Sequence, residues 1–217
     1  MKKLKMKKNL YDGKLITFCG LDGCGKTTLI KKLADSLSKT HKIFLTRQPT
    51  DVVRSSEIFR TYMDEPDHSA FDYRSLSLLA ASDRIQHVSN EISEALARGE
   101  TVISDRYFYS CLANLRARGY KKDAWIYEIS ENIIKPDLAF FLDIPVSIAI
   151  ERIRMRESEK NRYIDLPLQY RLRQEYIDIC RKNKGIFIDT RMSENVCFLQ
   201  IKSAADRLYG NEEKNFE

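Results

Sequence analysis

Short apolar runs recur along the chain, and between them apolar residues follow one another at steps of three and four. The runs predict five strands buried on both faces, because such strands carry few polar positions. They lie at residues 15–19, 42–46, 101–104, 137–143 and 186–189. Segments with helical spacing follow the strands and can cover both faces of a sheet. The pattern therefore predicts an α/β fold, a three-layer α/β/α arrangement with a five-stranded parallel sheet.

Capping residues mark the starts of several predicted helices. Asp72 and Asp123 precede helical patterns as N-caps, while Pro145 and Pro167 stand where a proline is tolerated in a first turn. Gly99 follows the long pattern that begins after Asp72 and predicts its end. The other helical patterns lie at residues 29–37, 53–63, 107–118 and 196–208.

The loop between the first predicted strand and the first helix carries a phosphate-binding motif. It matches G-x-x-x-x-G-K-[ST], the P-loop, with the residues Gly20, Leu21, Asp22, Gly23, Cys24, Gly25, Lys26, Thr27 and Thr28. Glycines let consecutive N–H groups and the helix N-terminus point at one anion. Lys26 is then expected on the β- and γ-phosphates of ATP, and the Thr27 hydroxyl on Mg²⁺. A glycine turn without a ligand would not explain that lysine and threonine.

Length and composition favour one P-loop kinase domain over residues 14–210, with a polar C-terminal tail at 211–217. Five of the six net positive charges come from lysines in an expected flexible N-terminal tail, residues 1–13. A solvated tail is favoured over an anion-binding arm, and no nucleic-acid partner is expected. Five cysteines without a C-x-x-C pair disfavour a disulfide framework or a zinc site. No run is long enough to span a bilayer, so a soluble, cytoplasmic protein with no membrane partner is expected.

Charged residues stand directly after two of the predicted strands. In an open α/β sheet these positions face the ligand crevice, which makes Arg47, Asp105 and Arg106 site candidates. Asp105 is expected to hold Mg²⁺ or its water, and it could equally cap the next helix. Arg47 could instead be a surface arginine at a turn. Asp83 and Arg84, inside a mostly apolar helix, could face either solvent or a pocket.

A dense arginine cluster follows the fourth predicted strand. Its charge excludes a core position, so the segment is either a solvated helix end or a mobile lid over the transferring phosphoryl group, at about residues 152–165. The arginines are Arg152, Arg154, Arg156 and Arg162. Helical spacing would put Arg152 and Arg156 on one face, with Arg154 opposite.

Arg47 and Arg106, at strand ends, could hold an anionic acceptor across the crevice. Two arginines there indicate an acceptor that already carries a phosphate. A nucleoside kinase would need a carboxylate base for a neutral hydroxyl, and the residue after Arg47 is the amide Gln48. Asp22 is the remaining candidate base. A phosphate acceptor has less need of a base, however, because its attacking oxygen is already ionised. These residues favour a nucleoside monophosphate kinase that uses ATP and Mg²⁺.

Over roughly residues 14–205 the chain resembles the thymidylate kinase family. Residues 20–28 are similar to its P-loop, 46–49 to its T-R-E-P segment and 78–84 to the stretch ending in its D-R pair. Residues 105–107 match its D-R-Y motif, 136–143 its P-D-L and L-D segment, and 152–162 its lid. The resemblance implies transfer of the ATP γ-phosphate to dTMP with Mg²⁺, in a homodimer. Because no arginine lies between Asp22 and Lys26, it implies the subclass whose catalytic arginines come from the lid.

The resemblance also implies roles for single residues. Arg106 and Arg47 would bind the acceptor phosphate, Arg84 the base, and Asp105 with Asp22 would organise Mg²⁺ and the sugar. The expected catalytic residues are Lys26, Asp22, Arg106, Arg152, Arg154, Arg156 and Arg162, and the expected metal ligands are Thr27 and Asp105. The expected acceptor pocket comprises Arg47, Gln48, Pro49, Ala80, Arg84, Asp105, Arg106, Ser110, Cys111 and Asn114.

The chain departs from the family pattern in this pocket. Gln48 replaces a glutamate, Ala80 a phenylalanine that stacks on thymine, Asn114 a tyrosine and Leu115 a common glutamine. Two alternatives to a dTMP kinase therefore remain at the level of sequence. One is a related kinase for another pyrimidine or purine monophosphate, and the other is a P-loop regulatory ATPase. No N-K-x-D element follows the fourth strand, which disfavours a GTPase switch.

Overall fold

The computed structural model describes residues 2–64, 67–68 and 71–210 of the chain. Five strands form one parallel sheet in the order β2-β3-β1-β4-β5. They are β1 (Lys14–Gly20), β2 (Ile43–Arg47), β3 (Thr101–Asp105), β4 (Leu138–Asp143) and β5 (Ile186–Asp189). Each lies within two residues of its predicted range, and the predicted parallel sheet is confirmed.

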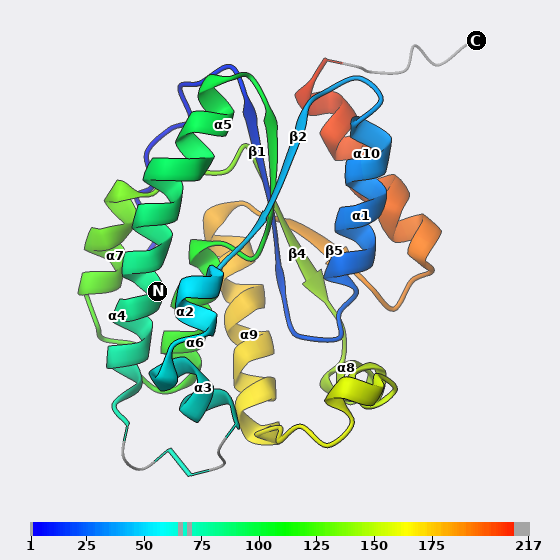
Figure 1. The fold of residues 1–217 in the computed structure, drawn as a ribbon. Coiled ribbons are helices and arrows are strands. Elements are labelled where there is room, and N and C mark those ends of the chain that lie inside the picture. Colours follow the sequence, from blue (N-terminus) through cyan, green and yellow to red (C-terminus); the bar gives the residue numbers. More distant parts are fainter. Residues whose placement is uncertain (1, 65–66, 69–70, 211–217) are drawn as a thin grey trace.

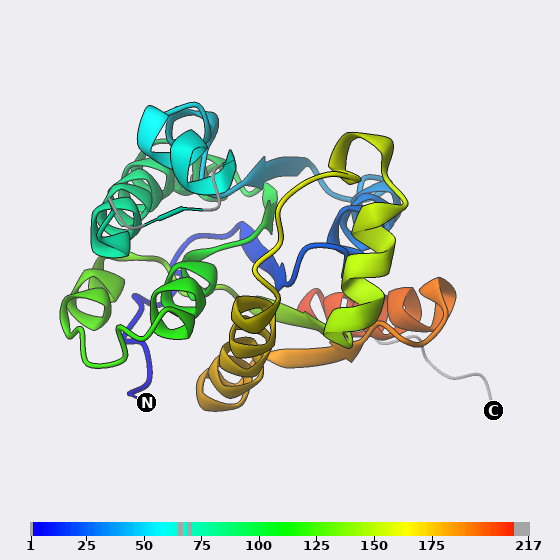
Figure 2. The same cartoon turned by 90° about the horizontal axis from the view of Figure 1, so that it is seen from below.

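Helices cover both faces of this sheet (Figure 1). On one side lie α1 (Lys26–Leu37), α8 (Val146–Arg154) and α10 (Glu194–Leu208), and on the other α4 (Tyr73–His87), α5 (Ser93–Ala97), α6 (Phe108–Ala117), α7 (Trp125–Ile129) and α9 (Leu166–Asn183). Viewed from below, the sheet separates the two groups, and α8 stands opposite α2 (Asp51–Arg54) and α3 (Glu57–Asp64) (Figure 2). This is the predicted three-layer α/β/α arrangement.

The long predicted helix before β3 is continuous but not uniform. Asp72 caps α4 by accepting a hydrogen bond from the Arg74 N–H at 2.9 Å, as predicted. A π-helical turn, Val88–Ile92, joins α4 to α5, and Gly99 follows with a positive φ of 76°. Inside the layers, fully buried side chains such as Phe18, Leu33 and Ile103 form the core.

Three helix boundaries differ from the prediction. The helix expected after Asp123 is only α7 and a 3-10 turn, Ser130–Asn132. The Asp123 carboxylate does not cap it but accepts hydrogen bonds from Trp125 Nε1 (3.0 Å) and Arg74 Nε (2.8 Å). The helix expected over 53–63 is divided into α2 and α3. Pro145 is the N-cap of α8 and so lies one residue before its first turn.

The expected flexible N-terminal tail is wrong for residues 4–7. Leu4 is only 5% exposed, and its N–H donates to Asn183 Oδ1 at 3.2 Å. Lys7 forms a parallel bridge with Ile134 through two backbone hydrogen bonds, of 2.9 and 2.6 Å. Leu4 and Met6 point inward while the intervening lysines are exposed, so this segment packs as an extended strand. The C-terminal tail at 211–217 lies outside the described residues.

The register of the sheet brings the site together. Phe18 of β1 pairs with Asp105 of β3 and Phe140 of β4, so the P-loop and the Asp105–Arg106 corner emerge at one edge. Arg47 of β2 pairs with Asp105 at the same edge. No helix in the described part of the chain is long and apolar enough to cross a membrane.

Candidate active site

The loop between β1 and α1 has the conformation that a phosphate cradle requires. Gly25, the N-cap of α1, has φ 91°, which a residue with a side chain rarely adopts. At Gly23, with φ 80°, a Cβ would lie 2.3 Å from the Ala149 carbonyl oxygen of α8. Both glycines are therefore needed where they stand, and the N-terminus of α1 is turned toward the cavity that they line.

A smaller cavity of about 160 Å³ lies over this loop. Its lining brings together Asp22, Gly23, Gly25, Lys26, Thr27, Arg47, Arg54, Asp105, Arg106 and Arg156. The Lys26 ammonium is 7% exposed at the residue level and donates to the carbonyl oxygens of Leu21 (2.8 Å) and Gly20 (3.2 Å). Gly20, Leu21, Cys24 and Thr28 complete the motif without lining the cavity.

Thr27, in the first turn of α1, and Asp105, at the end of β3, both line this cavity. The Oδ1 atom of Asp105 is buried and accepts no hydrogen bond from the described residues. A hydroxyl and an unpaired carboxylate oxygen are ligands that Mg²⁺ accepts. The described residues contain no cluster of three or more acidic, histidine or cysteine side chains for a metal. The pair therefore fits a Mg²⁺ ion held partly by protein and partly by substrate phosphates.

Asp22 lies between two arginines that come from distant segments. Its carboxylate is paired with Arg106 Nη2 and, at 2.9 Å, with Arg162 Nη2 of the lid. Burial raises the pKa of Asp22, but the charges of Arg106, Lys26 and Arg162 outweigh it and hold the pKa well below its usual range. Asp22 is therefore a permanent anion that joins the lid to the P-loop.

Arg106 turns back toward the P-loop because its backbone is left-handed, with φ 65°. Its N–H donates to the Phe18 carbonyl at 2.8 Å, and its own carbonyl accepts from Ser104 Oγ at 2.7 Å. Its Nη1 atom donates to the Gly20 carbonyl at 3.2 Å and to the Tyr176 hydroxyl at 3.0 Å. The guanidinium is thus fixed at a point where it lines two cavities.

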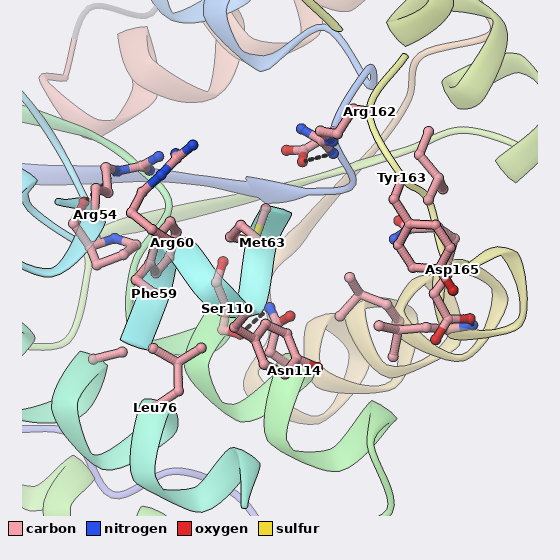
Figure 3. Close-up of a pocket in the computed structure, with 18 of the residues that line it drawn as sticks. Arg54, Phe59, Arg60, Met63, Leu76, Ser110, Asn114, Arg162, Tyr163 and Asp165 are labelled. Atoms are coloured by element: carbon pink, nitrogen blue, oxygen red, sulfur yellow. Dashed lines mark hydrogen bonds and ion pairs between the residues drawn. The ribbon is translucent and has the colours of Figure 1, made fainter. Parts of the chain in front are cut away.

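A larger cavity of about 790 Å³ adjoins the smaller one. Arg54 and Phe59 reach it from one side, Arg162 and Tyr163 from the other, and Ser110 lies on the floor between them (Figure 3). Of the predicted residues it gathers Asp22, Pro49, Ala80, Arg84, Arg106, Ser110, Cys111, Asn114, Arg156 and Arg162. The two cavities share Asp22, Arg54, Arg106 and Arg156.

The far end of the larger cavity combines one buried arginine with aromatic rings. Arg84 is 3% exposed, donates to the Ala80 carbonyl at 2.7 Å, and has a buried Nε without a described partner. Tyr62 and Tyr73 also line this cavity, with the Arg118 guanidinium 5.0 and 4.0 Å from their ring centres. The neighbouring Asp83 turns away and accepts hydrogen bonds from the N–H (2.9 Å) and hydroxyl of Thr50. The Asp83–Arg84 pair is thus divided between a loop contact and the cavity.

Gln48 and Arg47 do not lie where the sequence placed them. Gln48 is fully buried and lines neither cavity, and its Nε2 lies 3.0 Å from Nδ1 of His87. Because an amide nitrogen only donates, His87 accepts at Nδ1 and its Nε2 faces the Thr46 hydroxyl at 2.8 Å. Arg47 pairs with Asp51 and lines only the smaller, P-loop cavity.

The lid arginines separate into two pairs. Arg162 binds Asp22 and Glu159, and Arg156 lines both cavities without a side-chain hydrogen bond to another described residue. Arg152 instead donates to the Thr190 carbonyl at 3.3 Å, and Arg154 to carbonyls of Glu159 and Lys160 in the lid itself. Helix α8 ends at Arg154, so the expected shared face of Arg152 and Arg156 is not formed.

Comparison with known proteins agrees with this geometry. The family model described as Thymidylate kinase matches residues 18–201. The chain belongs to the thymidylate kinase family. Relatives include a "Probable thymidylate kinase" of Pyrococcus horikoshii, 38% identical over 77% of this chain and 82% of that protein. Another, from Thermococcus kodakarensis, is 33% identical over 89% and 97% respectively. The "Thymidylate kinase" of Staphylococcus epidermidis is 37% identical over 68% and 72%.

Both cavities are lined by an arginine that the sequence analysis missed. Arg54, at the end of α2, lines both cavities and donates from Nε to the Pro49 carbonyl at 2.8 Å. Burial lowers the pKa of Arg54, and the charges of Arg106 and Arg47 lower it further. A half-buried arginine that other cations crowd at a cavity fits an anionic ligand. Its position shortly after the Arg47–Pro49 segment, which follows the end of a strand, was the available signal.

Proposed function

We propose that this chain is a thymidylate kinase that transfers the γ-phosphate of ATP to dTMP and yields dTDP and ADP. The observation that supports this most is the junction of the two cavities, where Arg54, Arg106 and Arg156 meet. The smaller cavity has the P-loop on one side, and the larger one has room for a nucleotide. Phosphoryl transfer needs alignment and positive charge around the transferring group, and the junction supplies both.

The P-loop side is assigned to the donor. The N-terminus of α1 and Lys26 would bind the β- and γ-phosphates of ATP. Thr27 and Asp105 would hold Mg²⁺, which neutralises charge on the phosphates when bound. The free Oδ1 of Asp105 supports this part of the proposal.

The larger cavity is assigned to dTMP. Arg54 and Arg106 would bind its phosphate at the junction, with Arg84 and the rings of Tyr62 and Tyr73 at the base end. An oxygen of the dTMP phosphate attacks the γ-phosphorus, and the bond from that phosphorus to the β–γ bridging oxygen breaks. Because the attacking oxygen is already ionised, no general base is required. This agrees with a buried amide at Gln48.

The lid is assigned to the transition state. Arg156 lines both cavities at the junction, Arg162 lines the larger one, and Asp22 holds Arg162 and Arg106 toward each other. Cations at this point strengthen their contacts as charge spreads over the γ-phosphate oxygens. Arg152 and Arg154, which have other partners, are not assigned a direct role.

A panel of acceptors tests this function. With ATP and Mg²⁺ saturating, ADP formation is measured for each deoxy- and ribonucleoside monophosphate in turn. We expect dTMP to give the highest kcat/KM. A higher kcat/KM for a purine or ribose acceptor would assign the cavity to another nucleotide. The small side chain of Ala80, which lines the cavity, would give room for a larger base.

Three further features belong to the same proposal. The homodimer implied by the family is tested by light scattering, and the cytoplasmic location by fractionation of cells. The single kinase domain at 14–210 is tested by limited proteolysis, which should leave that range intact apart from cuts near the lid.

A further inference from the structure

A tyrosine outside both cavities contacts the arginine at their junction. The hydroxyl of Tyr176, on α9, accepts a hydrogen bond from Arg106 Nη1 at 3.0 Å and donates to Ser110 Oγ at 3.0 Å. Tyr176 is 4% exposed and lines neither the larger nor the smaller cavity. It therefore acts on bound ligands only through the residues that it holds.

The hydrogen bonds beyond Tyr176 fix the direction in which its hydroxyl donates. Ser110 donates onward to Cys19 Sγ at 3.8 Å, so each hydroxyl accepts one hydrogen bond and donates one. Burial raises the pKa of Tyr176 to about 12 and that of Cys19 to about 11, so both stay protonated near neutral pH. A neutral phenol cannot compete with a phosphate for the positive charge of Arg106, but it fixes where that charge points.

Helix α9 is placed to connect this contact with the lid and the cavity. Leu168, Leu172 and Tyr176 follow at steps of four on one buried face. The two leucines line the larger cavity, and Tyr176 reaches Arg106 one turn further on. Asp165, the last lid residue, caps this helix by accepting from the Leu168 N–H at 2.9 Å.

We propose that Tyr176 is a positioning residue for phosphoryl transfer, which holds the Arg106 guanidinium at the junction against the Gly20 carbonyl and Asp22. The proposal rests on the assignment of Arg106 to the dTMP phosphate. Without the hydroxyl, the guanidinium keeps its contacts with the Gly20 carbonyl and with Asp22 but loses the third contact that fixes its orientation at the junction. Because Arg106 is assigned to the dTMP phosphate, a loss of its orientation weakens the binding of the acceptor more than the binding of the donor.

The matched variants are Tyr176→Phe and Tyr107→Phe. Each removes one buried hydroxyl, but that of Tyr107 donates to the Ile134 carbonyl at 2.8 Å, and neither Tyr107 nor Ile134 lines a cavity of the site. We expect Tyr176→Phe to raise KM for dTMP roughly tenfold and to leave KM for ATP within about twofold. Tyr107→Phe should leave both constants within about twofold. Equal rises for the two variants, or a rise for ATP alone, would overturn the proposal.

A double-mutant cycle separates this inference from the function on which it rests. In an Arg106→Ala background, Tyr176→Phe should change KM for dTMP by less than about twofold, because the group that it positions is gone. A further tenfold rise would mean that Tyr176 acts by another route. If Arg106→Ala alone leaves KM for dTMP unchanged, the assignment of Arg106 itself is wrong.

Discussion

The lid offers the sharpest prediction, because the structure distinguishes arginines that the sequence could separate only by helical spacing. Arg156 lines both cavities, and its guanidinium makes no side-chain hydrogen bond to another described residue. Arg154 instead donates hydrogen bonds to carbonyls of the lid itself. The two residues lie two positions apart in one highly charged segment. Arg156→Ala and Arg154→Ala therefore form a matched pair that differs mainly in access to the transferring phosphoryl group.

The size of the expected effect follows from what Arg156 leaves behind. Removal of one preorganised donor from a transition-state site slows turnover by about 10²–10³-fold. Arg54 and Arg106 remain at the junction in this variant, with Arg162 beside it in the larger cavity, so we expect the lower end, about 10²-fold in kcat. Arg154→Ala should stay within about twofold of the parent, as a surface substitution away from the site does.

Turnover is measured with saturating ATP, Mg²⁺ and dTMP, following ADP by a coupled assay. Thermal unfolding of both variants controls for loss of fold. Arg156→Lys, which keeps the charge but not the fork of donors, should recover part of the rate. Comparable losses in Arg154→Ala and Arg156→Ala would refute the assignment, and so would near-parental turnover in both.

Two further predictions concern stability. Leu4→Ala should lower the free energy of unfolding by about 2–3 kcal/mol in urea, while Lys3→Ala stays within about 0.5 kcal/mol; equal values would mean that the N-terminal segment does not pack in solution. Burial lowers the pKa of His87, so the unfolded chain takes up its proton first and the parent loses stability as pH falls below about 6.5. His87→Gln should flatten that slope between about pH 7 and about pH 5 in urea unfolding, and an unchanged slope would contradict the buried, neutral histidine.

Much of the fold could be predicted because local signals and tertiary structure agree. The P-loop, β1 and α1 carry a motif, an apolar run and a helical stripe that all indicate one arrangement. Asp72 caps its helix with Oδ1, while its Oδ2 accepts from Arg74 Nη1 at 3.0 Å. Asp123 has the same chemistry but gives its carboxylate to Trp125 and Arg74, a partner about fifty residues away in sequence. Such competition is invisible to a local pattern.

The N-terminal segment shows a signal that was present but outweighed. Leu4 and Met6 alternate with lysines at the period of a strand, yet the lysine content favoured a solvated tail. Its partners, Ile134 and Asn183, lie far along the chain. Burial of one leucine and a few backbone hydrogen bonds hold it in place.

The candidate site was predictable where a strand end fixes a residue, and less so elsewhere. Asp105 ends β3 and Arg106 follows it, and they lie beside the junction and at it, as expected from the sheet. Arg54 was not predicted as a site residue because its position depends on the break between α2 and α3, which the mixed polar sequence did not indicate. Gln48 follows a strand too, but His87, from a helix some forty residues later, binds it away from the cavities.

The central claim is that the P-loop side of the junction delivers phosphate to dTMP. Its most direct test measures ADP and dTDP together, with and without dTMP, for the parent and Lys26→Ala. We expect the parent to form the two products one for one and to release little ADP without dTMP, while Lys26→Ala keeps its fold and loses at least about 10²-fold in rate. Comparable ADP release without dTMP, or near-parental transfer by Lys26→Ala, would contradict the account.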